Sequence, residues 1–218
     1  IRPQRTLWTQ TTKDGVEELR RIAQRHGVEY DTRSGQEVES DLRAKGIDAV
    51  PAVGPLAFLV RQPDGSLRSQ FTLADTEILP LGGLSNSVTV FCNEAGDWVT
   101  YLSDEHGFHN ARGIWGSEPV DIAALGGSHV QGACVPSDHN LVAVIRRRYP
   151  ATLNLGMANA GPLVALAHLK EYAAQFRPRI VLFFLPEPHD FAADLRKERG
   201  SPLLLRFLER GENEGVSH

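Results

Sequence analysis

Apolar residues recur at helical spacing near the start of the chain and then give way to short apolar runs separated by turns. Between Lys13 and His26 they return every three or four positions, and Gly27 follows as a helix stop. A weaker version of this pattern predicts a second helix at Gln36–Lys45. Two β-hairpins are predicted next, with strands at Leu56–Val60 and Ser66–Thr72, and at Ser87–Asn93 and Asp97–Leu102. The first 118 residues therefore predict a small α+β unit.

After Pro119 the pattern changes to continuous apolar runs that alternate with amphipathic segments. The runs predict strands at Val120–Leu125, Ala151–Leu155 and Arg179–Leu185, and the other segments predict helices at Leu141–Tyr149, Pro162–Phe176 and Ser201–Glu209. Continuous apolar strands joined by helices are typical of a parallel sheet that is covered on both faces. Residues 119–218 therefore predict an α/β domain that follows the α+β unit of residues 1–118.

The composition is that of an ordinary globular protein. The chain has 218 residues, of which 41% are hydrophobic and 23% charged, and its formal net charge is -4. This charge gives no electrostatic basis for binding nucleic acid, and no apolar run approaches the ~18 residues of a membrane span. The sequence begins at Ile1 and its single methionine is Met157. We therefore expect that a signal or membrane anchor lies upstream.

The two cysteines, Cys92 and Cys134, form neither a metal-binding cluster nor a CxxC pair. Free cysteines usually behave as small buried residues, and we expect this state for the pair. A disulfide bond is the alternative if the protein folds in an oxidising compartment.

Candidate chemistry follows the predicted strands of the second half, because ligands bind beyond the carboxyl ends of the strands in parallel α/β sheets. The first such loop, residues 126–132 (GGSHVQG), has neither of the phosphate-binding patterns GxGxxG and GxxxxGK. It does place Ser128 on a glycine-flanked turn directly after a strand, which is a typical position for an exposed nucleophile. The other two loops are residues 154–162 (NLGMANAGP) and residues 186–190 (PEPHD).

These three loops resemble the conserved blocks of the SGNH/GDSL hydrolase family. ALGGSHVQG is similar to the block around GDS, NLGMANAGP to the second block, and LPEPHD to the block that usually contains GND; the resemblance extends from about Tyr101 to Leu195. It implies a flavodoxin-like αβα sandwich that cleaves esters, often acetyl or acyl groups on glycans and lipids. No cofactor is expected. In that family the serine attacks, and a DxxH pair near the C-terminus supplies the base. The oxyanion is held by the serine N–H, a glycine N–H and an asparagine amide.

Carrying these roles over shows how far this chain departs from the family pattern. Ser128 stands at the nucleophile, but Gly127 replaces the preceding aspartate, and no DxxH occurs near the end of the chain. The oxyanion set becomes Ser128, Asn159 in place of glycine and His189 in place of asparagine. Asn159 can still donate its backbone N–H, because asparagine tolerates the left-handed conformation. His189 is a candidate oxyanion donor or replacement base, and Ser128 is interpreted as a vestigial nucleophile.

The remaining titratable residues are interpreted as structural. We expect His106, His109 and His139 to lie in polar loops, His129 to be a loop or helix-start residue, and His168 to have a surface or packed role. Asp104, Glu105 and Asp190 are interpreted as solvated loop acids, with paired carboxylates as the alternative. Their spacing matches no zinc site, so no metal is expected.

The predicted sheet is incomplete in comparison with the family. The family sheet has five parallel strands in the order 2-1-3-4-5, whereas this chain supplies three, so Arg179–Leu185 becomes an edge strand. An apolar edge strand is a template for aggregation unless something covers it. We expect the N-terminal unit, the Ser201–Glu209 helix or a partner protein to cover it. The alternative is that the native chain continues and supplies the remaining strands.

The N-terminal segment, including residues 30–53 and 78–110, resembles the extension that precedes the hydrolase-like domain in some SGNH-like proteins of the bacterial cell envelope. This resemblance implies an extracytoplasmic, periplasmic location and membership of a membrane-associated complex.

Three functional hypotheses follow from the sequence. The first is a pseudoenzyme, a catalytically silent SGNH-like domain that acts as a structural or interaction subunit. The second is a serine ester hydrolase or acyl transferase that acts on glycans or lipids, with Ser128 as nucleophile and a base outside this segment. The third is a carbohydrate- or lipid-binding module whose cleft is lined by Met157, Asn159, His129 and His189.

Overall fold

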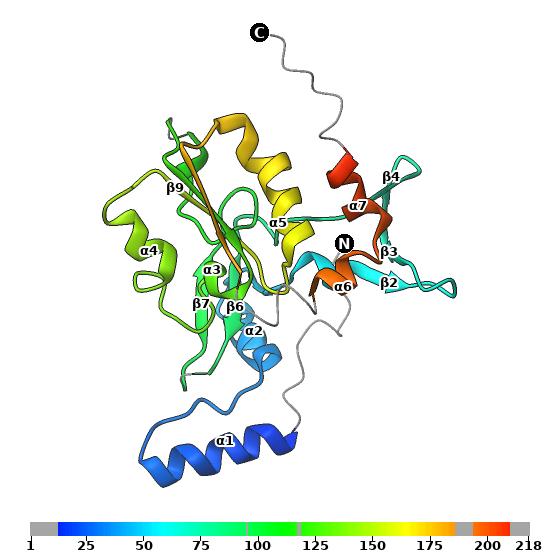
Figure 1. Ribbon diagram of the computed structural model, residues 1–218. Helices are drawn as coiled ribbons and strands as arrows, with labels where there is room; N and C mark the ends of the chain where they lie inside the picture. Colours follow the sequence, from blue (N-terminus) through cyan, green and yellow to red (C-terminus); the bar gives the residue numbers. More distant parts are fainter. Residues whose placement is uncertain (1–12, 95, 117–118, 186–193, 210–218) are drawn as a thin grey trace.

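The computed structural model describes residues 13–94, 96–116, 119–185 and 194–209. The chain is a mixed α/β protein whose described strands form two three-stranded sheets and two two-stranded sheets (Figure 1). Both helices predicted near the N-terminus are confirmed as α1 (Lys13–His26) and α2 (Gly35–Ala44). In Figure 1, α1 extends away from the rest of the molecule at the lower edge of the view.

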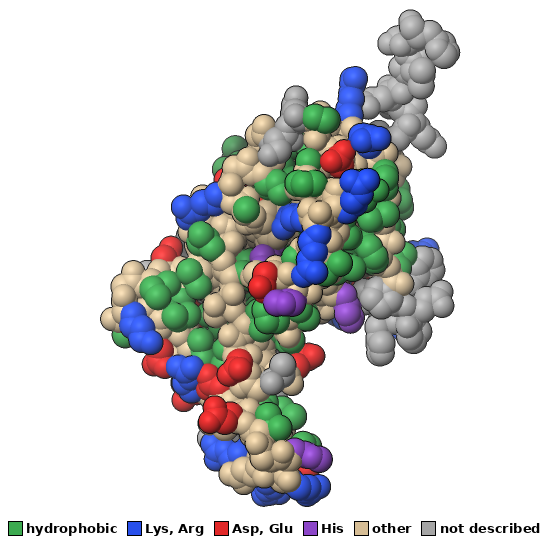
Figure 2. Space-filling model, turned by 90° about the vertical axis from the view of Figure 1, so that its left-hand side faces the viewer, with side chains coloured by type: hydrophobic (Ala, Val, Ile, Leu, Met, Phe, Trp, Pro, Cys, Tyr) green, Lys and Arg blue, Asp and Glu red, His purple; other side chains and the backbone are tan. Residues whose placement is uncertain are grey.

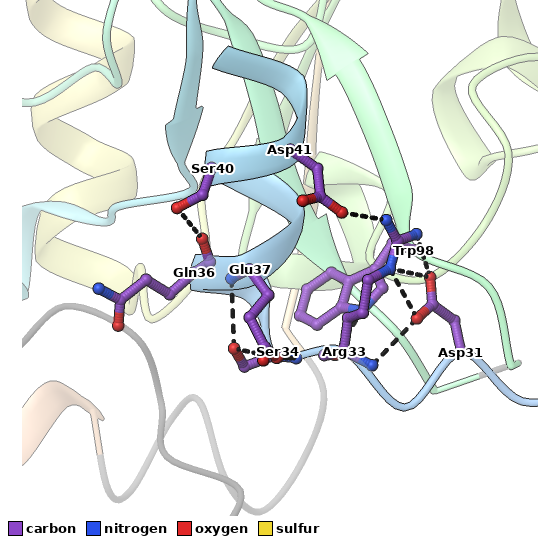
Figure 3. Close-up of polar contacts among 8 residues, drawn as sticks. All are labelled: Asp31, Arg33, Ser34, Gln36, Glu37, Ser40, Asp41 and Trp98. Atoms are coloured by element: carbon purple, nitrogen blue, oxygen red, sulfur yellow. Dashed lines mark hydrogen bonds and ion pairs between the residues drawn. The ribbon is translucent and has the colours of Figure 1, made fainter. Parts of the chain in front are cut away.

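The start of α2 is fixed by side chains of the segment that leads into it (Figure 3). Ser34 is the N-cap: its hydroxyl accepts a hydrogen bond from Glu37 N, and the Glu37 carboxylate accepts one from Ser34 N. This reciprocal capping box satisfies two N–H groups that a helix start otherwise leaves unpaired. Arg33 forms ion pairs with Asp31 and Asp41, which joins the incoming chain to the helix.

The first three-stranded sheet has the order β1-β6-β7. The predicted hairpin is confirmed as the antiparallel pair β6 (Val88–Cys92) and β7 (Val99–Leu102), and β1 (Ala49–Pro51) adds parallel to β6. The other predicted hairpin is also confirmed, as β2 (Leu59–Arg61) and β3 (Leu67–Ser69).

A further hairpin, β4 (Phe71–Leu73) with β5 (Thr76–Ile78), is a finding of the structure. Its turn residues, Ala74 and Asp75, both have positive φ. Asn-Gly and Asp-Gly are the usual sequences of such a turn, so Ala74-Asp75 does not predict a hairpin.

The second three-stranded sheet contains the strands predicted after Pro119. They are β8 (Ile122–Gly126), β9 (Thr152–Gly156) and β10 (Ile180–Phe184), which pair in parallel in the order β10-β8-β9. One face packs against α3 (Ser128–Gln131) and α4 (Leu141–Arg146), and the other against α5 (Pro162–His168). In Figure 1, α4 and α5 lie on opposite sides of these strands.

The predicted continuous helix Pro162–Phe176 is only partly correct. It is α-helical over α5 and continues as a π-helical turn, Leu169–Ala173, and a 3₁₀ turn, Ala174–Phe176. The widened turn coincides with the aromatic packing of Tyr172, whose ring lies 4.9 Å from that of Phe108 and 5.6 Å from that of His106. π-Helical turns of this kind re-aim a side chain within a helix.

One hydrophobic core runs through both halves of the chain. Leu81, Phe108 and Trp115 from the first half pack with Leu125 and Leu155 from the second-half sheet. The division into residues 1–118 and 119–218 stays a prediction, and in the described structure the two parts share this core.

The strand β10 lies at an edge of its sheet and is exposed. The exposed fractions of Ile180, Val181 and Phe183 are 45%, 44% and 44%. The helix α7 (Pro202–Glu209) instead packs against α5 and β3, and the described residues of the N-terminal half do not cover these side chains. The expectation that the N-terminal unit or the Ser201–Glu209 helix covers this edge is therefore wrong for the described residues. In Figure 1, α7 lies to the right of the sheet.

Candidate functional site

Ser128 lies where the sequence pattern placed it, at the turn between β8 and α3. Gly127 is the N-cap of α3, and Ser128 is its first residue. The preceding Gly126 has a φ of 153°, and a Cβ there would lie 2.6 Å from Phe184 O. The turn thus requires a glycine. The Ser128 side chain is partly exposed, and no group in the described part of the chain hydrogen-bonds to its hydroxyl.

The loop after β9 lies against α3, so the structure brings the first two sequence blocks together. Ala158 N donates a 2.6 Å hydrogen bond to Gln131 Oε1, and a Cβ on Gly156 would collide with Gln131 N and the backbone of Val130. Asn159 in this loop has a φ of 59° and is exposed. It therefore adopts the left-handed conformation that asparagine tolerates, and its predicted role as an oxyanion donor stays a prediction. His189 lies outside the described residues, so its predicted role stays a prediction.

Gln131 is the residue that organises this region, and it was not singled out in the sequence. Its side chain is buried, and besides accepting from Ala158 N it donates to Tyr101 Oη at 2.8 Å. One amide thus joins β7, α3 and the loop after β9. The burial that this requires raises the pKa of Tyr101 to about 12, so its hydroxyl stays protonated. The only sequence signal was the place of Gln131 inside the motif GGSHVQG.

His109 is buried in the same network, which corrects its prediction as a residue of a polar loop. Its Nδ1 lies 2.7 Å from Gln131 O and its Nε2 lies 2.9 Å from Ser137 Oγ, while its ring stacks on Tyr101. Because a carbonyl only accepts, Nδ1 carries the proton and Nε2 accepts from the serine hydroxyl. Burial lowers the pKa of His109, so this neutral form is favoured. Both ring nitrogens are therefore occupied away from Ser128.

Asp104 is also buried, and its prediction as a solvated loop acid is wrong; its neighbour Glu105 is exposed. One carboxylate oxygen accepts from the backbone N–H groups of His106 and Phe108, each at 2.8 Å. The other accepts from Asn110 Nδ2 and Trp115 Nε1, each at 2.8 Å. These four donors explain how a carboxylate is tolerated in a core.

Asn110 continues this network to the outer edge of β9. Its Oδ1 accepts from Asn154 N at 2.8 Å, and its Nδ2 donates to Asn154 O at 3.0 Å. The side-chain amide thus pairs with β9 as a neighbouring strand would. Arg146 donates to Thr152 O and to Asn110 Oδ1, so the next outward-facing group of β9 is paired as well. No periodic pattern signals these contacts, because they join positions up to 44 residues apart.

His168, His106 and His139 make structural contacts. His168 is buried, as a packed role predicts; its Nε2 donates to Leu81 O at 2.8 Å, and burial lowers its pKa to about 4. His106 packs edge-on against Trp115, and His139 pairs with the adjacent Asp138. His129 is exposed beside Ser128.

Glu198 closes the start of α5, which is the helix of the second block. This buried carboxylate, from α6 (Leu195–Glu198), accepts from the backbone N–H groups of Gly161, Leu163 and Val164. Burial raises its pKa to about 7, against the lowering effect of these three donors. A titratable group thus holds the second block in place.

Cys92 and Cys134 form a disulfide bond, so the expectation of free thiols is wrong. Their Cα atoms are 5.3 Å apart, and the bond joins β6 to the segment that follows α3. The pairing could not be predicted from the sequence, because the two cysteines are 42 positions apart. They meet only when the N-terminal sheet packs beside the second sheet.

The described residues contain neither a metal-binding cluster nor a membrane-spanning helix. They contain no group of three or more His, Cys, Asp or Glu side chains that could hold a metal ion. None of their helices combines the length and the apolar character that crossing a membrane requires.

Comparisons of the chain with protein-family models, with curated proteins and with solved structures find no match. The geometry of the site and the three sequence blocks are therefore the basis on which its function is argued.

Proposed function

We propose that this protein is a catalytically silent SGNH-like domain with a flavodoxin-like sheet, and that it acts as an interaction subunit of a membrane-associated assembly in the cell envelope. The parallel order β10-β8-β9 matches the first three strands of that fold, 2-1-3, when the strands are numbered along the chain. The positions of Ser128 at the end of β8 and of Asn159 after β9 are compatible with the first two family blocks.

The main support for a catalytically silent domain is that no catalytic base contacts Ser128 among the described residues. Its hydroxyl has no hydrogen-bond partner in the described structure, and His109, the imidazole that contacts its helix, is engaged at both nitrogens. A serine without an adjacent base loses about 10²–10⁴ in rate from general-base catalysis. Gly127 in place of the family's aspartate and His189 in place of its asparagine also support a loss of activity.

Turnover of an activated ester tests this proposal. We expect p-nitrophenyl acetate to be hydrolysed at the same slow rate by the wild-type chain and by Ser128→Ala. A nearby exposed residue, His129→Ala, is the matched control. Hydrolysis by the wild type that disappears only in Ser128→Ala would show a working enzyme and reject the silent reading.

The second candidate is a serine ester hydrolase or acyl transferase whose base lies outside the described residues. The exposure of Asn159 beside the Ser128 turn is compatible with it, because an exposed loop residue can present its backbone N–H as an oxyanion donor. A fluorophosphonate probe should then label Ser128 in the full-length protein as produced by its host. No labelling of the wild type beyond that of Ser128→Ala would exclude this candidate.

The proposed extracytoplasmic location is supported by the disulfide between Cys92 and Cys134. Disulfides persist in oxidising compartments and are rare in the cytosol of most cells. Protein taken from its native host under thiol-trapping conditions should react with a maleimide reagent only after reduction. Labelling of both cysteines before reduction would contradict an oxidising location.

A further inference from the structure

The strand β10 has the sequence of an interior strand but occupies an edge. Ile-Val-Leu-Phe-Phe is apolar at every position, which is typical of a parallel strand that is buried on both faces and paired on both edges. Among the described strands β10 pairs only with β8, and three of its five side chains are exposed. Apolar side chains also reach the surface beside Lys and Arg side chains over the upper part of the face in Figure 2. In the second sheet, among the described residues, β10 is the strand whose outer edge has no partner strand or side chain.

The free edge of β10 offers the backbone groups of Val181 and Phe183. Ile180 N donates to Asp121 O, and Phe184 O lies close to Gly126, so the even-numbered residues direct their backbone groups toward β8. Alternate residues of a strand point their backbone groups in opposite directions. Val181 and Phe183 therefore direct theirs outward, and no hydrogen bond to them is found outside the β8 ladder in the described structure.

The opposite edge of the same sheet is already closed. At β9, the outward Thr152 O accepts from Arg146, and the outward Asn154 N and O pair with the Asn110 side chain. Among the described strands of this sheet, β10 is therefore the edge that can take a further strand, and an assembly that joins two β10 edges leaves β9 edges covered by these side chains at both ends. Such growth stops at two copies.

We propose that β10 pairs with β10 of a second copy of this chain, antiparallel and centred on Leu182, to form a continuous six-stranded sheet. The proposal rests on the proposed function, since it identifies the partner of that interaction subunit. Val181 of one copy then faces Phe183 of the other, and their outward N–H and C=O groups make four backbone hydrogen bonds. These pairs also place a β-branched side chain beside an aromatic one, which stabilises antiparallel strands.

Charge favours this arrangement over a parallel one. Arg177 and Arg179 precede β10 and are both exposed, and Asp121 pairs with Arg179. Parallel pairing of two β10 strands would bring these arginines together at one end of the interface. Antiparallel pairing about a two-fold axis places them at opposite ends, and it opposes apolar residues at every position from 180 to 184.

The oligomeric state of the full chain provides the first test. We expect sedimentation velocity to show a monomer–dimer equilibrium, and Val181→Lys to weaken the dimer by at least about tenfold. The matched control is Val144→Lys, on an exposed valine of α4, and we expect it to leave the equilibrium unchanged. A wild-type chain that stays monomeric up to its solubility limit would overturn the proposal, as would a dimer that only Val144→Lys disrupts.

Cross-linking tests the register. Centred pairing brings the two copies of residue 182 to a Cα separation of about 4.5 Å, which suits a disulfide. Leu182→Cys should therefore form a covalent dimer on mild oxidation. Ile180→Cys should not, because four residues of offset separate its two copies by roughly 13 Å. Efficient cross-linking of Ile180→Cys without Leu182→Cys would reject the centred register.

These outcomes are separable from those of the proposed function. A monomeric chain without ester turnover would refute the second-copy pairing and leave the silent reading in place. A dimer that hydrolyses the ester through Ser128 would refute the catalytically silent function and leave the β10 pairing in place.

Discussion

The two edge strands of the second sheet flank the same central strand, yet one is buried and the other is exposed. All five residues of β9 are buried, including the polar Thr152 and Asn154. In β10, which is entirely apolar, Ile180, Val181 and Phe183 are exposed. The more hydrophobic strand is thus the one that remains in contact with water.

The difference lies in what reaches each edge from elsewhere in the chain. Asn110 arrives from the loop after β7 and pairs with the backbone of β9, and Arg146 from the end of α4 pairs with Thr152 O. No described element does this for β10. Burial of an edge is therefore decided by the hydrogen bonds that other segments can supply, because an unpaired buried backbone group costs more than an apolar contact returns.

The largest expected effect comes from opening the closed edge. Asn110→Ala leaves Asn154 N, Asn154 O and part of Asp104 unpaired in the core. We expect the free energy of unfolding to fall by about 4 kcal/mol, measured by urea denaturation. Asn140→Ala, which removes the N-cap of α4 and one hydrogen bond to Ser137 O, should cost about 1 kcal/mol. Equal losses in the two variants would show that Asn110 does not close the edge.

A second expected effect concerns the start of α5 and depends on pH. Glu198 ionises near 4.5 in the unfolded chain and near 7 in the folded one. The folded state therefore binds more protons between these values, and stability should fall as pH rises from about 4.5 to 7, by up to about 3 kcal/mol.

Glu198→Gln removes this titration, so its free energy of unfolding should change less than that of the wild type between pH 5 and pH 7.5. The exposed Glu105→Gln is the matched control and should keep the wild-type slope. A slope that is unchanged in Glu198→Gln would assign the pH dependence to another group.

The smallest expected effect is at the open edge. Val181→Thr should change the free energy of unfolding by less than about 0.5 kcal/mol at concentrations where the chain is monomeric, because the side chain is already exposed. Val142→Thr places a hydroxyl in the buried cluster between α4 and the sheet and should cost about 1–3 kcal/mol. Thermal denaturation of both variants gives the contrast, and a large loss in Val181→Thr alone would mean that the monomer buries β10.

The sequence predicted the regular elements better than the polar contacts among them. Periodicity located both N-terminal helices and all three strands of the second sheet, because each of these signals is local. The burial of Asp104 and His109 was not foreseen, because single polar residues in a loop carry no periodic pattern. The β4–β5 hairpin was missed because its turn lacks the usual glycine.

In the candidate site, too, the sequence predicted the positions of the loops but not the polar contacts between them. Motif and strand order placed Ser128 after β8 and brought its loop beside that of Asn159, and the glycines of both turns gave the signal. The role of Gln131 could not be predicted, because it depends on Tyr101 from the other half of the chain.

By itself, the sequence determined most of the helix and strand segments, the parallel character of the second-half sheet and the place of Ser128 directly after its first strand. These depend on side-chain periodicity and on residues adjacent in the chain. Only the tertiary structure decided that Cys92 meets Cys134, that Asn110 closes β9 and that β10 is left open. Each of these depends on segments that are distant in sequence and become neighbours when the shared core forms, and no local pattern encodes that proximity.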